Sequence, residues 1–251
     1  MRREYGQVYA DLYHQHWWWR SRETIVLDTV GRLDLPDNAA ILDVGCGDGL
    51  LLPKLAVYGN VSGLEIDTSL VHKDNPYRNR IYTQPLGSPV YQSKRFDLIT
   101  AFDVIEHITD DAAAIQNMAR MLRDGGRLLI TVPAFMALWD EHDEMNLHYR
   151  RYTIGSLRNL LEPHGRIVQM RYLFPSLFLP KLAIRCVNKM RRKKVAQHRL
   201  PSPRVNQWMT NLCLAEHELT SWMRIPFGTS VMAILEKPIE VPAIMPHLAA
   251  A

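Results

Sequence analysis

The chain has 251 residues, of which 47% are apolar and 22% are charged, with a formal net charge of +4 at pH 7. This length suits one large domain, or one domain with an elaboration, and the composition is that of an ordinary globular protein. The positive charge is weaker than the basic footprint of most nucleic-acid binders, so charge alone does not indicate that class.

The cysteines and the apolar runs indicate the expected compartment. Cys46, Cys186 and Cys213 are far apart, lack a zinc-binding spacing and suit a reducing compartment. The first residues have no apolar signal-peptide core, and no run reaches the roughly 18 apolar residues of a membrane span. We therefore expect a cytoplasmic protein.

The first predicted element is a helical region over residues 8–30, which contains the triplet Trp17-Trp18-Trp19. Consecutive side chains on a helix point about 100° apart, so one apolar face cannot hold all three indoles. Trp19 aligns with Val26 and Val30 and is the predicted core residue. Trp17 and Trp18 have no comparable place, since Trp17 shares its side with polar residues.

Between residues 39 and 132, apolar strands alternate with helices. Strands are predicted at Ala39–Val44, Asn60–Ile66, Asn79–Thr83, Phe96–Ala101 and Arg127–Val132, and helices at Leu50–Tyr58 and Asp110–Leu122. This alternation predicts a parallel sheet with covering helices.

The remaining elements are a helix, two strands and a helical segment between those strands. The helix is Thr153–Leu161, with Thr153 as its N-cap, and the strands are Gly165–Leu173 and Thr229–Glu236. The segment contains two amphipathic helices, Pro180–Lys194 and Trp208–Met223. Two sets of residues share opposite sides of the first of them: Leu182, Ala183, Cys186, Val187 and Met190 on one, and Lys181, Arg185, Asn188, Lys189 and Arg192 on the other.

The sequence LDVGCGDGL, residues 42–50, resembles a nucleotide-binding turn. A strand delivers Asp43 to a turn that contains Gly45 and Gly47, where the ligand can approach the backbone closely. Glu65 closes the next strand and can accept hydrogen bonds from both hydroxyls of a ribose. The spacing differs by one residue from the dehydrogenase pattern, and a P-loop is excluded because no G-K-[ST] follows.

Together with FDLITAFDVIEHI and LRDGGRLLITVP, these motifs resemble the class I S-adenosylmethionine (SAM)-dependent methyltransferases of the small-molecule type. The resemblance covers roughly residues 38–173 and 229–236. It implies an α/β, Rossmann-like fold with a seven-stranded, mostly parallel sheet whose last strand is antiparallel and lies between strands five and six. The expected parts are an N-terminal helical lid (1–37), the SAM-binding core (38–173 and 228–237), a helical insertion between the last two strands (174–227) and an extended tail (238–251).

The resemblance also implies which residues bind SAM. Glu65 should hold the ribose, Ile66 should flank the adenine, and Trp18 and Arg22 should close the pocket from the lid, the indole near the sulfonium and the guanidinium near the carboxylate. The expected SAM-binding residues are Asp43, Gly45, Cys46, Gly47, Glu65, Ile66, Leu86, Ala101, Phe102, Trp18 and Arg22.

Two further groups are candidates for the acceptor side. His107 follows the fourth strand and is either the general base that deprotonates the acceptor or a residue that only shapes the pocket. The sequence WDEHDEMNLHYRRYT follows the fifth strand and is either a substrate-binding segment or a solvated, salt-bridged loop. Its predicted substrate-binding residues are Trp139, His148, Arg150, Arg151 and Tyr152, and no metal site is predicted.

The expected acceptor is an oxygen or nitrogen atom of a small or lipid-like molecule. The apolar and basic residues of 173–194 could contact the inner face of a membrane peripherally, or cover the sheet or a partner. One alternative is an RNA-modifying methyltransferase that uses the basic patch 185–194, and another is a non-catalytic SAM-binding protein. DVIEH differs from the motif of amino-group DNA methyltransferases, which disfavours nucleic acid.

Overall fold

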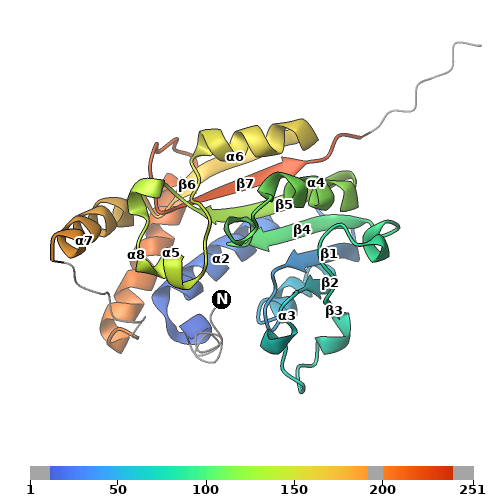
Figure 1. Ribbon diagram of the computed structural model, residues 1–251, viewed down its shortest axis with the longest axis horizontal. Helices are drawn as coiled ribbons and strands as arrows, with labels where there is room; N and C mark the ends of the chain where they lie inside the picture. Colours follow the sequence, from blue (N-terminus) through green and yellow to red (C-terminus); the bar gives the residue numbers. More distant parts are fainter. Residues whose placement is uncertain (1–11, 192–199, 240–251) are drawn as a thin grey trace, which may run out of the picture.

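The computed structural model describes residues 12–191 and 200–239, with a seven-stranded sheet of order β3-β2-β1-β4-β5-β7-β6 at the centre (Figure 1). The strands are β1 (Ala39–Val44), β2 (Gly59–Leu64), β3 (Ile81–Tyr82), β4 (Phe96–Phe102), β5 (Leu122–Pro133), β6 (Arg166–Leu173) and β7 (Ser230–Glu236). β1 to β5 are parallel, and β7 runs antiparallel between β5 and β6. The predicted fold, including the position of the last strand, is confirmed.

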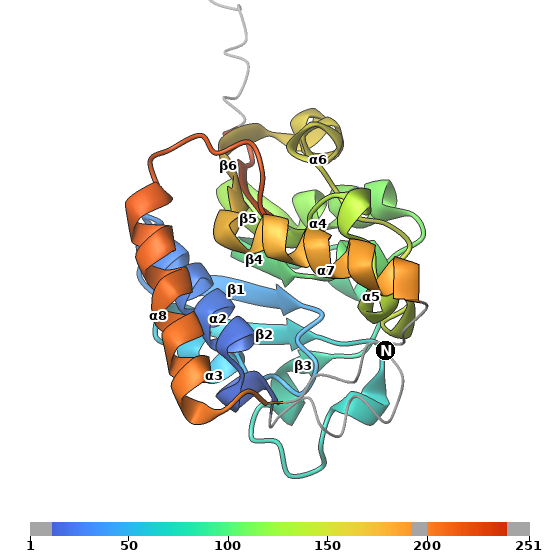
Figure 2. The ribbon, with the colours of Figure 1, turned by 90° about the vertical axis from the view of Figure 1, so that its left-hand side faces the viewer.

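Helices cover both faces of the sheet (Figure 2). α4 and α6 pack on one face, while α2, α3 and α8 pack on the other. The α-helices are α2 (Trp17–Gly31), α3 (Leu52–Leu55), α4 (Asp111–Met121), α5 (Glu141–Met145), α6 (Ile154–Leu161), α7 (Phe178–Arg191) and α8 (Pro203–Thr220). Short 3-10 helices are η1 (Thr68–Leu70), η2 (Arg78–Arg80), η3 (Pro89–Tyr91), η4 (Ile105–His107), η5 (Met136–Leu138), η6 (Glu162–His164) and η7 (Pro175–Leu177). Over the described ranges, no helix has the length and apolar character that crossing a bilayer requires.

Capping side chains fix where the two helices on the first face begin. The Asp110 carboxylate accepts the N–H of Ala113 at the start of α4, and the Thr153 hydroxyl accepts the N–H of Ser156 at the start of α6. The predicted N-cap at Thr153 is confirmed. α4 follows β4 after η4, and α6 follows β5 after η5 and α5, so the two caps lie at the far ends of the segments that carry the candidate site.

One predicted helix is much shorter than expected. The pattern over Leu50–Tyr58 predicts more than two turns, but α3 spans only Leu52–Leu55. The chain leaves the glycine turn at Gly49 and enters β2 at Gly59, so turns on both sides of α3 occupy the rest of this segment. Leu52 and Leu55 supply the two buried side chains that this short crossover needs.

The helices of the insertion turn polar residues toward the protein, contrary to the usual reading of their patterns. On α8 the buried residues are Thr210 and Cys213, while Trp208 is 62% and Leu219 is 70% exposed. The apolar 4-3-4-3 stripe of Trp208–Met223 therefore does not face the core. Spacing defines a helix face, but the packing of α8 on α2 decides which face is covered.

α7 is reversed in the same way. The Arg185 guanidinium donates to the backbone carbonyls of Ala137 and Trp139, at 2.5 and 2.6 Å, and Lys181 pairs with Asp140. Ile184, on the other side of the helix, is 60% exposed. These cations are therefore not simply solvated, and Arg192, Lys193 and Lys194 lie outside the described residues.

The three tryptophans at the start of α2 have different surroundings. Trp19 is 6% exposed, which confirms it as a core residue. Trp17 is half-buried because α8 covers its side of the helix, where its backbone N–H donates to Asn206 Oδ1 at 2.7 Å. Ser21 on that side is fully buried, so the expectation that this is no core face is wrong. Trp18 packs at 4.8 Å from the ring of Phe174.

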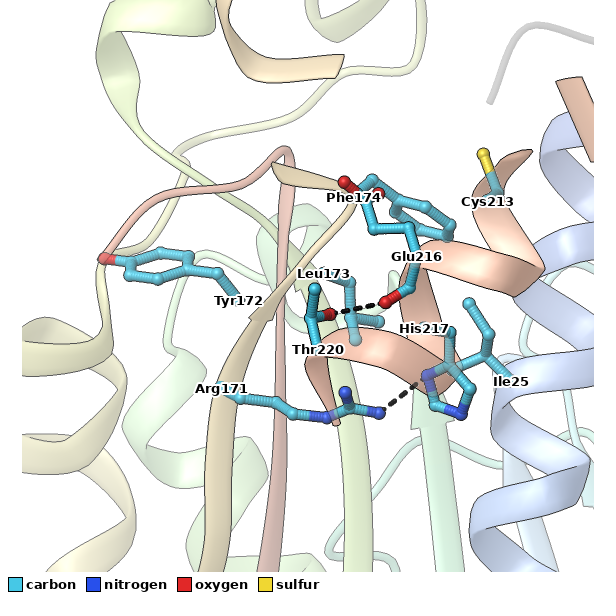
Figure 3. Close-up of a pocket in the computed structure, with 9 residues that line it drawn as sticks. All are labelled: Ile25, Arg171, Tyr172, Leu173, Phe174, Cys213, Glu216, His217 and Thr220. Carbon is cyan, nitrogen blue, oxygen red and sulfur yellow. Dashed lines mark hydrogen bonds between the residues drawn. The ribbon is translucent and has the colours of Figure 1, made fainter. Parts of the chain in front are cut away.

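A polar chain of contacts joins β6, α8 and α2, and Figure 3 shows its first part, between Arg171 and His217. An Arg171 guanidinium N–H donates to His217 Nδ1 at 2.8 Å, and His217 Nε2 lies 3.2 Å from Asp28 Oδ2. Since Nδ1 accepts from a cation, the proton of neutral His217 belongs on Nε2, where it can be donated to the carboxylate. Protonation of Nδ1 would place two donors against each other.

We expect low pH to weaken this chain of contacts. Burial lowers the pKa of His217, with Arg171 and Arg32 adding to the shift and Asp28 opposing it. The unfolded chain then binds more protons, so the free energy of unfolding falls as pH drops below about 6.5. Urea titrations at pH 7 and pH 5 should show His217→Gln losing about 1 kcal/mol less than the parent. An identical loss in both proteins would contradict this assignment, and the exposed His72→Gln is the control.

Candidate functional site

The glycine turn after β1 is open where the expected donor would lie. Gly45, Gly47 and Gly49 have φ values of 70°, 55° and 69°, which side chains rarely adopt. A Cβ on Gly45 would lie 2.6 Å from the Val104 side chain, whereas a Cβ on Gly47 would meet nothing within 4 Å. The turn therefore packs closely at its start on the segment that follows β4, and it leaves free space beside Gly47.

Glu65, which follows β2, is oriented by the same turn. Its Oε2 accepts the backbone N–H of Gly47 at 3.0 Å, and its Oε1 accepts that of Asp67 at 2.8 Å. The residue is only 8% exposed. Each carboxylate oxygen can accept a second hydrogen bond, so the pair can receive two neighbouring hydroxyls.

Asp43, at the end of β1, is a buried acid beneath the turn. The Thr100 hydroxyl on the neighbouring β4 donates to Asp43 Oδ1 at 2.7 Å, as the register of the two strands dictates. Burial raises the pKa of Asp43 to about 7, against the opposing influence of the Thr100 hydrogen bond and the Arg22 charge. Its charge can therefore respond to a cationic ligand at neutral pH.

α2 reaches this site through an ion pair. Arg22 binds the carboxylate of Asp103, the residue directly after β4. Asp103 has a φ of 55°, which is uncommon outside glycine and often occurs at functional sites. Trp18 lies one helical turn before Arg22. Like Leu50 beside the glycine turn, it packs against the cluster of Leu12, Tyr13 and Trp19. The predicted lid residues thus lie at the edge of the candidate donor site.

The other predicted donor residues lie around the same strand ends. Ala101 is fully buried at the end of β4, and Phe102 is half-buried. Ile66 is 64% exposed directly after Glu65, as an apolar wall for a ring would be. Cys46 is half-buried in the turn, and Leu86 packs against the core below α4.

His107 lies in η4, just beyond β4. Its ring centre is 4.5 Å from that of His148 in an edge-on contact. Burial, with His148 beside it, lowers the pKa of His107 to about 4. The imidazole is therefore neutral at pH 7 and a weaker base than an exposed histidine.

A buried carboxylate organises the segment after β5. Asp143 is fully buried, accepts two hydrogen bonds of 2.8 Å from Arg151 and lies 2.8 Å from His148 Nδ1. The pKa of Asp143 is held well below its usual range, since the hydrogen bonds from His148 and Arg151 outweigh burial. This part of the segment is an internal network rather than a solvated loop.

The remaining predicted substrate-binding residues also make internal contacts. The Tyr152 hydroxyl donates to Asp111 at 2.8 Å and its ring lies in the core, and Arg150 pairs with the same carboxylate at 2.8 Å. The Trp139 carbonyl accepts from Arg185. A substrate contact by Arg151 would have to break its pair with Asp143.

Sequence reasoning gave no donor-site role to Thr100 or Asp103, and it assigned no functional role to Glu106. Thr100 becomes visible only once the register with β1 is known. Asp103 and Glu106 belong to the quoted motif DVIEH, but their roles follow from their burial and contacts, which the sequence does not show. Glu106 is fully buried, and neither carboxylate oxygen has a hydrogen-bond partner. In the part of the chain that the structure describes, one group could hold a metal ion: Glu106, His107 and His148.

Comparisons with known proteins identify relatives of the N-terminal two-thirds. Residues 15–168 match the family described as "Methyltransferase domain". The chain is 35% identical over 98 residues to the ubiquinone biosynthesis O-methyltransferase of Coxiella burnetii, covering 36% of this chain and 42% of that protein. It is 28% identical over 140 residues to the Nitrosomonas europaea protein of the same name, covering 48% and 58%. The chain thus spans about half the length of these relatives.

Solved structures share the whole architecture at low identity. The [4+2]-cyclase SpnF has a TM-score of 0.58 and 19% identity, covering 94% of both chains. Phosphoethanolamine N-methyltransferase 2 of Haemonchus contortus, solved with SAM, has a TM-score of 0.52 and 16% identity, covering 86% of this chain and 52% of that one. These likenesses establish the fold alone, since the two proteins differ in the reactions that their names describe.

Proposed function

Because the chain belongs to the methyltransferase domain family of the class I SAM-dependent methyltransferases, we propose that it transfers a methyl group to an oxygen atom of a small or lipid-like molecule. The observation that supports this most is the convergence of the glycine turn, Asp43 and Glu65 at neighbouring strand ends. The dehydrogenase pattern is G-x-G-x-x-G, whereas the third glycine here comes one residue earlier.

The donor would lie along the open side of Gly47. Glu65 would accept hydrogen bonds from the ribose, and Asp43 would face the positively charged methionine part. In the reaction, the acceptor oxygen attacks the methyl carbon in line, the S–C bond breaks, and its electron pair stays on sulfur. The acceptor proton leaves to a base or to water. His107 stays a candidate for that base, weakened by its burial.

Calorimetry and labelled donor test this proposal. We expect SAM and S-adenosylhomocysteine to bind and NAD not to bind. We also expect methyl-labelled SAM to label an oxygen of one component when the protein is incubated with a metabolite or lipid extract. NAD binding without S-adenosylhomocysteine binding would overturn the assignment, and donor binding without any transfer would favour the non-catalytic alternative.

The sequence suggests that the apolar and basic residues of 173–194 contact a membrane together. For a lipid-like acceptor or a peripheral membrane contact, we propose instead that α7 uses its apolar residues. The exposed Leu179 and Ile184 could enter a lipid surface, because Lys181 and Arg185 are turned toward the protein. An apolar rather than a basic contact would therefore dominate.

Trp18 is the lid residue that the geometry favours. We expect Trp18→Ala to weaken SAM binding about 5- to 10-fold, since an indole near a sulfonium contributes roughly 1 kcal/mol. The effect should be smaller for neutral S-adenosylhomocysteine, which calorimetry can compare directly. Trp208→Ala, on the exposed side of α8, is the matched control. Unchanged SAM affinity in Trp18→Ala would refute this role.

A further inference from the structure

We propose that Glu106, His107 and His148 form a binding site for a divalent transition-metal ion beside the donor site. Each of the three offers one ligand atom, and these atoms all lie within 4.8 Å of one another. The residues come from two separate segments, η4 after β4 and the segment after β5, which the sheet brings together.

Glu106 is the observation that points to a cation. Its carboxylate is fully buried, and neither oxygen has a hydrogen-bond partner. A buried carboxylate without partners is costly, and native proteins rarely leave one unexplained. A bound cation would supply the missing partner.

His148 is oriented as metal-binding histidines are. Asp143 is ionised, because Arg151 binds both of its oxygens, so it can only accept a hydrogen bond. His148 Nδ1 therefore carries the proton and donates it to Asp143 at 2.8 Å. This leaves Nε2 with a free lone pair, in the carboxylate–histidine–metal arrangement that fixes the tautomer and raises the basicity of the ligand.

His107 completes the set. A neutral imidazole has one ring nitrogen with a free lone pair, so His107 can supply one ligand atom. Its ring stands edge-on to that of His148 at 4.5 Å between centres, which lets the two face a common point.

The ligand types indicate the class of ion. Two imidazoles and one carboxylate suit Zn²⁺, Co²⁺, Fe²⁺ or Mn²⁺ rather than Ca²⁺ or Mg²⁺, which prefer oxygen. Ligands about 2 Å from a tetrahedral ion lie about 3.4 Å apart, so binding would draw the three side chains together slightly. A fourth position would remain for water or an acceptor oxygen. Ion binding itself does not depend on the proposed methyl transfer.

Metal titration of the full chain tests the site. After treatment with EDTA, the Cys186→Ser protein should bind one Zn²⁺ by calorimetry and give the visible absorption of low-symmetry Co²⁺. This background removes the exposed thiol. Glu106→Gln, which is isosteric and removes a buried charge, and His148→Gln should each weaken Zn²⁺ binding at least about 100-fold. Asp143→Asn should weaken it about 10- to 100-fold. The exposed His72→Gln should change nothing.

S-adenosylhomocysteine calorimetry on the same samples separates the two proposals. Variants that bind it like the parent but lose the metal support the site. The proposal would be overturned by a folded parent that binds neither Zn²⁺ nor Co²⁺. It would also be overturned if Glu106→Gln and His148→Gln bound Zn²⁺ as tightly as the parent does. Metal binding without binding of the donor product would instead count against the proposed function alone.

Discussion

Replacing Glu65 by alanine should weaken binding of S-adenosylhomocysteine about 100-fold, measured by calorimetry. The carboxylate would make two hydrogen bonds to the ribose, each worth about 1.5 kcal/mol or more because the acceptor is charged, and their loss corresponds to two decades in affinity. The change also removes the acceptor that holds the Gly47 N–H at 3.0 Å, so the turn loses its orientation as well.

A conservative variant separates these two effects. Glu65→Gln keeps one acceptor oxygen and should lose less affinity than Glu65→Ala. Glu162→Ala, on the exposed end of α6, serves as the control for loss of a carboxylate. Affinity within threefold of the parent in Glu65→Ala would show that the donor lies elsewhere.

Asp143→Ala should lower the free energy of unfolding by about 3–5 kcal/mol, the cost of leaving a buried cation unpaired. The Arg151 side chain is 2% exposed and binds Asp143 through two hydrogen bonds, so water cannot replace the lost partner. Urea denaturation followed by tryptophan fluorescence would measure the loss.

The double variant provides the internal check. Asp143→Ala combined with Arg151→Met removes both charges and should recover part of the loss, because the uncompensated cation is gone. The network does not act as described if Asp143→Ala is as stable as the parent. The same holds if the double variant loses more free energy of unfolding than the two single variants lose together.

Local patterns predicted the sheet and the donor turn well. Apolar runs bounded by glycines marked the strands, and the spacing in LDVGCGDGL required a turn with positive φ. Both features depend on consecutive residues, so they can be predicted without knowing which distant residues they contact. The lone Asp43–Thr100 contact depends instead on strand register, which the sequence did not show.

Non-local partners explain what sequence reasoning missed. The roles of Arg151 and Tyr152 could not be read from HYRRY, because Asp143 and Asp111 capture their polar groups. Sequence reasoning could not assign the inward faces of α7 and α8, since helical periodicity identifies two faces but not the one that is covered. Arg185 and His217 find internal acceptors only because the segment after β5 and α2 lie beside them.

The polar contacts of α7 and α8 affect how easily these two helices unfold locally. A contact that buries hydrogen bonds and ions, rather than apolar area, gains little from the hydrophobic effect and is readily hydrated once broken. The insertion should therefore behave as a separate cooperative unit, opening at a lower free energy than the sheet, whose strands bury the apolar core. Amides of α7 and α8 should then exchange faster than those of the sheet and of α4.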